Sequence, residues 1–275
     1  MNAFSSADRP VRAAAALSGG VWLPLLQQLT KVIKDGGVWK NAEDALEGTG
    51  DVDYTAPPGR WSLIREEFRR WAGRVAAHPV LVCRHIPFTM LAVAVDRERR
   101  ELLQLDVRSR LTFRGSTLVR ASELPPLMVM DADGFRRLRP GAEGVLKLVH
   151  KGLGMGGRPK WPRLRDEQVE HLLRSDPQGV REAVELLGTR NVLRGASALA
   201  AGQWNRRAMV LSDLLFTARA VLEPATALQR LRFRLVERDR CPIVVATTRN
   251  ARRIPEPVDR WVRLAERHHP DGTPR

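Results

Sequence analysis

The sequence predicts an α+β protein in which a mixed sheet with flanking helices is followed by a mostly helical C-terminal lobe. Two observations support this prediction. Short runs of apolar residues with strand-like alternation follow one another between Val38 and Val107. From about Gly141 onward, apolar residues recur at helical spacing instead. We therefore expect one domain over residues 21–139 and a helical domain over residues 140–265.

The elements expected in the first half are two amphipathic helices and five short strands. Three of the strands lie so close together in the chain that we expect them to pair as antiparallel hairpins. In order, the elements are a helix over Val21–Lys34, a strand at Val38–Trp39, a loop over Asn41–Gly50, a strand at Asp51–Tyr54, a helix over Trp61–Val75, and strands at Leu81–His85, Thr89–Val95 and Glu101–Val107.

The second half is expected to be built from helices and one late strand. A first helical segment begins at about Gly141 and ends at Gly152, and the tail from His268 is expected to be disordered. The further helices are predicted at Asp166–Arg174, Gly179–Leu187, Trp204–Leu222 and Ala225–Val236, and the strand at Cys241–Thr248.

The chain carries 46 basic and 31 acidic residues, a net charge of +15. A field of this sign favours polyanions or phosphorylated ligands as partners. A second interpretation is compositional, because most of the basic residues are arginine and the chain is rich in alanine, valine and leucine, as a GC-rich coding sequence would give. Charge alone leaves both interpretations open. No aromatic-rich RNA platform stands out in the sequence, and Tyr54 is the single tyrosine.

Two cysteines, Cys83 and Cys241, are too few for a disulfide framework or a four-ligand zinc site. We therefore expect reduced thiols in a cytoplasmic protein. No stretch approaches the roughly 20 apolar residues that span a bilayer. Near the N-terminus the apolar run is interrupted by Gly19, Gly20 and Pro24, which argues against a signal peptide. No membrane partner is expected.

Three aspartates carry the chemistry that the sequence indicates. Asp51 and Asp53 lie two residues apart in a predicted strand, so their carboxylates point to the same face. Asp106 shares a face with Gln104 in another strand whose opposite face is apolar. Converging carboxylates repel each other unless a cation lies between them, and Mg²⁺ or Mn²⁺ takes such oxygen ligands. The pattern therefore predicts a divalent-metal site, against the alternative of three structural acids.

Two other motifs are given structural interpretations. Asp131 and Asp133 form a second D-x-D, but they follow an apolar run and precede a glycine, which is typical of a turn or a helix cap. Residues Gly152–Gly157 match G-x-G-x-x-G. A dinucleotide site needs a strand before this motif and a helix beginning within it. Here a helical pattern precedes it and Pro159 follows, so a glycine hinge between the two halves is favoured.

The order of elements resembles the nucleotidyltransferase superfamily, the DNA polymerase β-like group that includes antibiotic and toxin nucleotidyltransferases. The resemblance covers residues 21–107. It is carried by the stretch from Val38 to Asp53, with its glycine-containing loop and D-x-D strand, and by the hydrophobic-Asp-hydrophobic triplet at Asp106. In the family, a nucleoside monophosphate is transferred from an NTP to an acceptor.

The resemblance implies that residues 21–139 form a catalytic domain in which Asp51, Asp53 and Asp106 bind Mg²⁺ or Mn²⁺. It also implies that Asp106 takes the proton of the acceptor. An NTP such as ATP would be the donor, and the acceptor, which the sequence does not identify, would be a small molecule, RNA or a protein.

One departure concerns the nucleotide. Lys40 and Asn41 stand where the family usually has Gly-Ser at the end of the first strand. Lys40 can pair with phosphate and Asn41 can donate hydrogen bonds. Because of the departure, a second function stays open: a catalytically inactive nucleotidyltransferase-like module that binds RNA or a protein partner. The further candidates for holding the triphosphate are Gly48, Thr49, Gly50, Lys147 and Lys151.

Overall fold

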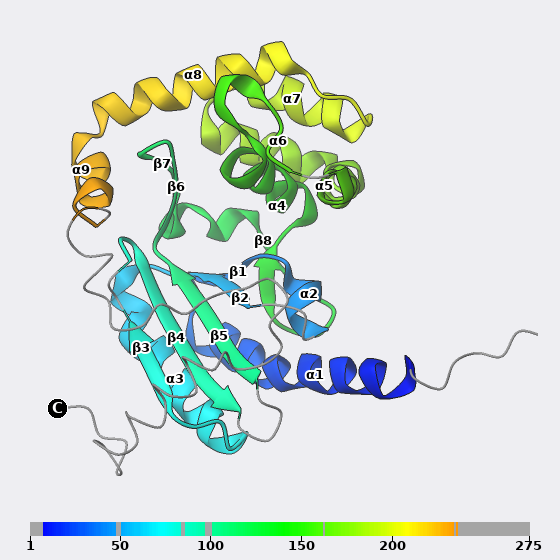
Figure 1. Ribbon diagram of the computed structural model, residues 1–275, viewed down its shortest axis with the longest axis vertical. Coiled ribbons are helices and arrows are strands. Elements are labelled where there is room, and N and C mark those ends of the chain that lie inside the picture. The colour runs from blue at the N-terminus through cyan, green and yellow to red at the C-terminus, as the bar shows by residue number, and fades with distance from the viewer. Residues whose placement is uncertain are drawn as a thin grey trace, which may run out of the picture.

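The computed structural model of the chain describes residues 8–47, 51–83, 86–96, 101–161, 163–233 and 235. Within these ranges, a seven-stranded mixed sheet and a two-stranded hairpin are combined with nine α-helices, which confirms the α+β prediction (Figure 1). The strand predicted at residues 241–248 and the tail from His268 lie outside the described residues.

The large sheet has the strand order β3-β4-β5-β2-β1-β9-β8. As predicted, β3 with β4 and β4 with β5 pair antiparallel. The pairs β2–β5 and β1–β9 are parallel, so the sheet is mixed. Its strands are β1 (Gly37–Lys40), β2 (Val52–Thr55), β3 (Val80–Cys83), β4 (Thr89–Asp96), β5 (Glu101–Arg108), β8 (Met128–Met130) and β9 (Arg136–Leu138).

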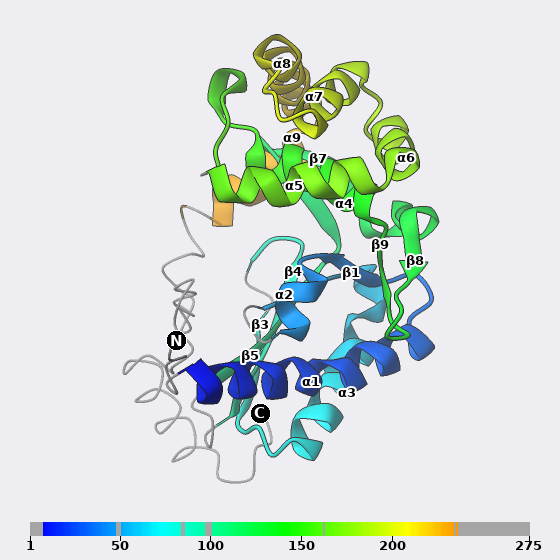
Figure 2. The ribbon, with the colours of Figure 1, turned by 90° about the vertical axis from the view of Figure 1, so that its right-hand side faces the viewer.

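One face of this sheet is covered by α1 (Asp8–Val32) and α3 (Trp61–Arg74), which lie side by side (Figures 1 and 2). The rings of Trp22 on α1 and Trp71 on α3 stack at a centroid distance of 4.7 Å. The helices pack on alternate residues of the strands because side chains alternate between the faces of a sheet. The sheet residues of this core are Val38, Val52, Tyr54, Met90, Ala92, Ala94, Leu103, Leu105 and Val107.

The second half is a bundle of helices that forms its own buried cluster. Residues of the sheet half also belong to this cluster: Trp39 of β1, and Leu111 and Phe113 of the hairpin formed by β6 (Arg110–Phe113) and β7 (Ser116–Arg120). Figure 1 shows the hairpin reaching from the sheet toward these helices. The helices of this cluster are α4 (Pro140–Lys147), α5 (Arg163–Ser175), α6 (Pro177–Leu187), α7 (Arg190–Ala200) and α8 (Arg206–Leu222). Helix α9 (Pro224–Arg232) follows them and contacts α8 and β7.

Some predicted elements differ from the structure. Helix α1 begins at Asp8 rather than Val21 and contains Pro24. The predicted loop 41–50 contains a short helix, α2 (Ala42–Leu46). Strands β6 to β9 were not expected, because three to five residues are too few to show a clear alternation. Helix α7 was also not predicted, since its glycine, alanine and serine residues weaken the apolar pattern.

None of the helices in the described part of the chain is both long enough and apolar enough to cross a membrane.

Two helical glycines should respond oppositely to replacement by alanine. A Cβ atom at Gly141 of α4 would lie 2.0 Å from the Asp176 carbonyl oxygen, whereas one at Gly73 of α3 would meet nothing within 4 Å. Gly141→Ala should lower the free energy of unfolding by about 1–3 kcal/mol through overpacking. Gly73→Ala should raise it by up to about 1 kcal/mol, because alanine is the better helix former. Denaturant titration of both variants checks this, and equal effects would contradict the close packing of α4 on α6.

Candidate metal centre

The parallel pairing of β2 with β5 brings the three predicted aspartates together. Asp53 is the direct partner of Asp106 in the strand register, and Asp51 immediately precedes β2. One carboxylate oxygen from each residue can be chosen so that all three lie within 4.8 Å of one another. The side chains point away from the face that α1 and α3 cover, since the intervening Val52 and Leu105 belong to that core. The sequence-based expectation that these acids converge is confirmed.

Burial and the neighbouring negative charges make Asp53 and Asp106 costly to ionise. Asp53 is 1% exposed, and its pKa is raised mainly by burial, with the Asp51 charge acting in the same direction. Burial also raises the pKa of Asp106 to about 6, and the charges of Asp53 and Asp51 add to the effect. Gln104 donates a hydrogen bond of 3.0 Å to Asp106. A divalent cation at this place would favour the ionised form of all three carboxylates.

Lys40 is the closest cation to the buried acid. It lies opposite Asp53 across the β1–β2 pair, at a point where the strand register shifts, and its ammonium group forms an ion pair with the Asp53 carboxylate. The Lys40 side chain is 12% exposed. Lys40 therefore neutralises part of the negative charge and occupies the side of Asp53 that faces β1.

Two further cations lie near the acids. Arg108, on the same face of β5 as Asp106, places its guanidinium 4.0 Å from that carboxylate. The pKa of Lys151 is lowered, first by burial of its ammonium group and then by the charges of Lys40 and Arg108, while Asp53 and Asp51 act in the opposite direction. The residue as a whole remains exposed. The centre thus combines three carboxylates with three cations.

Arg108 was not among the sequence-based candidates. Its signal was present, however, because Gln104, Asp106 and Arg108 alternate along one strand face.

Lys147 has a different environment from Lys151. It is 6% exposed and forms an ion pair of 2.8 Å with Glu143. The Glu143 carboxylate also accepts the backbone N–H of Asn41 at 2.9 Å and is paired with Arg137 at 3.2 Å. Lys147 and Asn41 are therefore held in an internal network, which corrects the expectation that Lys147 faces the same ligand as Lys151.

The remaining candidate phosphate-binding residues, Gly48, Thr49 and Gly50, lie outside the described residues.

The second D-x-D is a turn, as predicted. Asp131 and Asp133 connect β8 to β9, and the Asp133 N–H donates to the Asp131 carboxylate at 3.1 Å. The Gly134 N–H closes the turn on the Asp131 carbonyl at 3.0 Å. This pair provides a natural control for Asp51 and Asp53.

The glycine-rich run also has a structural role. A π-helical turn precedes it, and Gly156 and Gly157 have positive φ angles of 62° and 69°. The Gly156 N–H donates to Asp213 on α8 at 3.0 Å, and Trp204 donates to the Gly157 carbonyl at 2.8 Å. The run lacks the strand-turn-helix context of a dinucleotide site. These hydrogen bonds hold the run against α8 and Trp204, whereas the sequence favoured a hinge between the two halves.

In comparisons with known proteins, no protein-family model, curated protein or solved structure matched the chain. The case for a function therefore comes from the chemistry of the site.

The raised pKa of Asp106 predicts a pH-dependent stability in metal-free buffer. Its folded-state value of about 6 exceeds the ordinary value of 3.8, so the folded state binds the proton more tightly than the unfolded state does. The contribution of Asp106 to stability is present at low pH and is lost as the pH rises through about 6. Between about pH 7 and pH 5 it amounts to on the order of 1 kcal/mol.

This contribution can be measured by denaturant titration of the wild type and Asp106→Asn at both pH values. Asp106→Asn should lack the contribution and be at least as stable as the wild type near pH 7. Asp131→Asn, the control, should keep the pH dependence of the wild type. A loss of about 3–5 kcal/mol in Asp106→Asn near pH 7 would instead identify Asp106 as a structural acid with an essential partner.

Proposed function

We propose that the chain is a metal-dependent nucleotidyltransferase that transfers a nucleoside monophosphate from an NTP to an acceptor. The observation that carries this proposal is the register of β2 and β5, which sets Asp53 beside Asp106 and leaves Asp51 within reach. A D-x-D strand next to a strand with a third acid, in a mixed sheet, supports a nucleotidyltransferase-like fold. The order of α1, β1, β2, α3 and β5 along the chain supports this resemblance.

The donor set fits a hard divalent cation. The three groups are carboxylates, one of them 1% exposed. Burial first, and then the charges of the neighbouring aspartates, raises the pKa values of Asp53 and Asp106. Asp51, Asp53 and Asp106 would hold Mg²⁺ or Mn²⁺, which takes oxygen ligands and completes its shell with water and phosphate. When bound, such an ion stabilises the charge that develops on the transferring phosphoryl group and the leaving pyrophosphate.

The residues around the acids have separate roles in the proposed reaction. Lys151 and Arg108 bind phosphate oxygens, because burial and the charges of Lys40 and Arg108 lower the pKa of Lys151 and a bound anion would offset both effects. The acceptor oxygen attacks the α-phosphorus, and the bond to the bridging oxygen of pyrophosphate breaks. Asp106, in the role that the resemblance implies, accepts the proton that leaves the acceptor hydroxyl.

The ion pair between Lys40 and Asp53 favours a second candidate function. An ammonium group held by the buried acid competes with a divalent cation for the same carboxylate. If Lys40 does not leave Asp53, the chain is an inactive module in which the lysine has replaced the metal. The two candidates differ in whether the wild-type protein binds Mn²⁺ and an NTP.

The active-enzyme proposal predicts that NTP with Mg²⁺ or Mn²⁺ raises the melting temperature, because the ligands bind the native state. Asp53→Asn and Asp106→Asn should abolish this shift and lower nucleotidyl transfer by at least about a hundredfold, since even outer-shell metal partners are worth 10–100-fold. Transfer is measured with labelled NTPs against RNA, small molecules and the protein itself. Asp131→Asn and Asp133→Asn should retain activity. The proposal fails if millimolar NTP and divalent ions leave the wild-type melting temperature unchanged.

Lys40→Met separates the two candidate functions. Removing the competing ammonium group should tighten Mn²⁺ binding by roughly tenfold, about 1.4 kcal/mol, as measured by titration calorimetry. Lys31→Met removes the same charge from an exposed position on α1 and should leave Mn²⁺ affinity unchanged. Mn²⁺ binding by the wild type and by Lys40→Met supports the enzyme, whereas binding by Lys40→Met alone supports the inactive module.

A further inference from the structure

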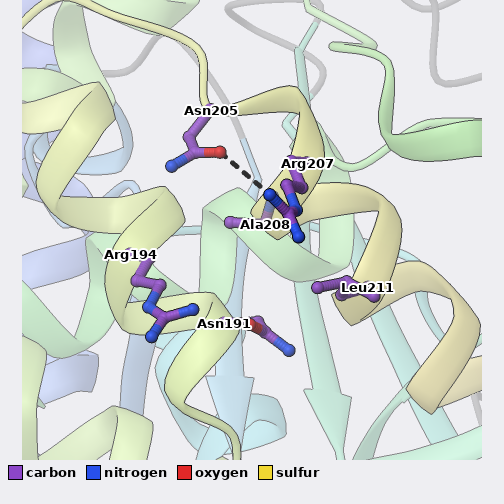
Figure 3. A pocket seen from close by; sticks show the side chains of 6 residues that line it. All are labelled: Asn191, Arg194, Asn205, Arg207, Ala208 and Leu211. Carbon is purple, nitrogen blue, oxygen red and sulfur yellow. Dashed lines mark hydrogen bonds between the residues drawn. The ribbon is translucent and has the colours of Figure 1, made fainter.

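A pocket of about 240 Å³ lies between α7 and α8, and none of the three aspartates lines it (Figure 3). Two arginines and two asparagines line it together with two apolar residues, and no carboxylate is among the lining residues. The lining is formed by Asn191, Arg194, Asn205, Arg207, Ala208 and Leu211. Figure 3 shows Arg194 on α7 and Arg207 on α8, the two helices that border the pocket.

The polar groups of this pocket are mainly hydrogen-bond donors. Arg194 and Arg207 carry guanidinium groups, which donate and cannot accept. Asn205 caps α8, and its side-chain oxygen accepts the Ala208 N–H at 3.0 Å, as the dashed line in Figure 3 shows. This bond fixes the orientation of the amide and leaves its NH₂ group to donate elsewhere. A lining of donors with two positive charges is complementary to an anion that has several acceptor oxygens.

The surrounding charge is also unbalanced. Residues 190–222, which comprise α7, α8 and their connection, contain five arginines and a single acid, Asp213. That acid is already engaged, since it pairs with Arg114 at 3.0 Å and accepts the Gly156 N–H. Among the described residues, neither Arg194 nor Arg207 forms an ion pair with an acidic side chain. Exposed arginines gathered without acids attract anions.

A neighbouring pocket of about 320 Å³ shows the contrast. It is bordered by Glu167, Glu170 and Trp204, so its charged groups are acidic. The two pockets share the same helical half and differ in sign, which makes the basic one a local feature rather than a uniform effect of the net charge.

We propose that the pocket between α7 and α8 binds phosphate groups in the backbone of a nucleic-acid strand. Two guanidiniums on neighbouring helices suit phosphate oxygens, and the exposed Leu211 offers an apolar contact for a sugar or base. A strand, rather than a single phosphate, fits a shallow basic surface on a chain of net charge +15. RNA and DNA share this chemistry. Binding of the strand does not depend on the proposed transfer function. Only a role of the bound strand as the acceptor of that transfer would rest on it.

The test measures binding without metal or NTP, so its result is independent of the transfer activity. Fluorescence anisotropy of labelled single-stranded RNA and DNA of about 16 nucleotides is recorded over a range of salt concentrations. The double variant Arg194→Ala/Arg207→Ala is compared with Arg69→Ala/Arg181→Ala, which removes two exposed arginines on α3 and α6. Both variants remove the same charge, and all four positions are exposed, so folding should be preserved.

The variant Arg194→Ala/Arg207→Ala should bind the strand at least about tenfold more weakly than the wild type near physiological salt. The magnitude of its salt slope should fall by about 1.4, because two phosphates would no longer have an arginine to neutralise them and each contributes about 0.7 for a single strand. The control variant should keep the slope of the wild type. Tighter binding of RNA than of DNA would identify the strand as RNA. Equal binding of the two would show that only the phosphodiester backbone is recognised.

Three results would overturn the proposal: no binding by the wild type at low salt, equal weakening in both variants, or the same pocket-dependent binding of polyglutamate in place of nucleic acid.

Discussion

The parallel register between β2 and β5 is the constraint on which the rest of the structure depends. It places Asp53 directly opposite Asp106, so two carboxylates occupy adjacent positions on one face of the sheet. Parallel neighbours cannot be joined by a tight turn. The chain therefore passes through α3, β3 and β4 before it returns as β5. That passage also supplies the helix that covers the opposite face, so the elements that bury the core are the ones that bring the acids together.

The cations around the acids follow from the same arrangement. Lys40 reaches Asp53 because β1 pairs with β2, and Arg108 reaches Asp106 because the two share a strand face. Lys151 comes from the other half of the chain, in the π-helical turn that follows α4. Carboxylates and cations in close proximity can be stable without any ligand, and this is why the ion pair of Lys40 bears on whether the centre is active.

The sequence was informative wherever a pattern is local. The alternation around Asp51, Asp53 and Asp106 predicted their common direction, and the strand order in the chain predicted the antiparallel hairpins. Short elements such as α2 and β6 to β9 were missed because they contain too few residues to show a period. The network of Glu143 was also missed, since it joins Asn41 to a residue 102 positions away in the chain. Such pairings follow from tertiary packing, and no pattern in the neighbouring sequence indicates them.

Glu143 belongs to the helical half, yet its carboxylate holds the backbone N–H of Asn41, the residue that follows Lys40 at the end of β1. Trp39, just before Lys40, is fully buried among residues of that same half. The end of β1 is therefore fixed by groups from both halves. A fragment that stopped at residue 139 would expose the Trp39 ring and deprive Arg137 of one of its carboxylates. The Lys40 side of the acidic centre thus depends on groups from both halves, and the two halves are expected to unfold as one cooperative unit.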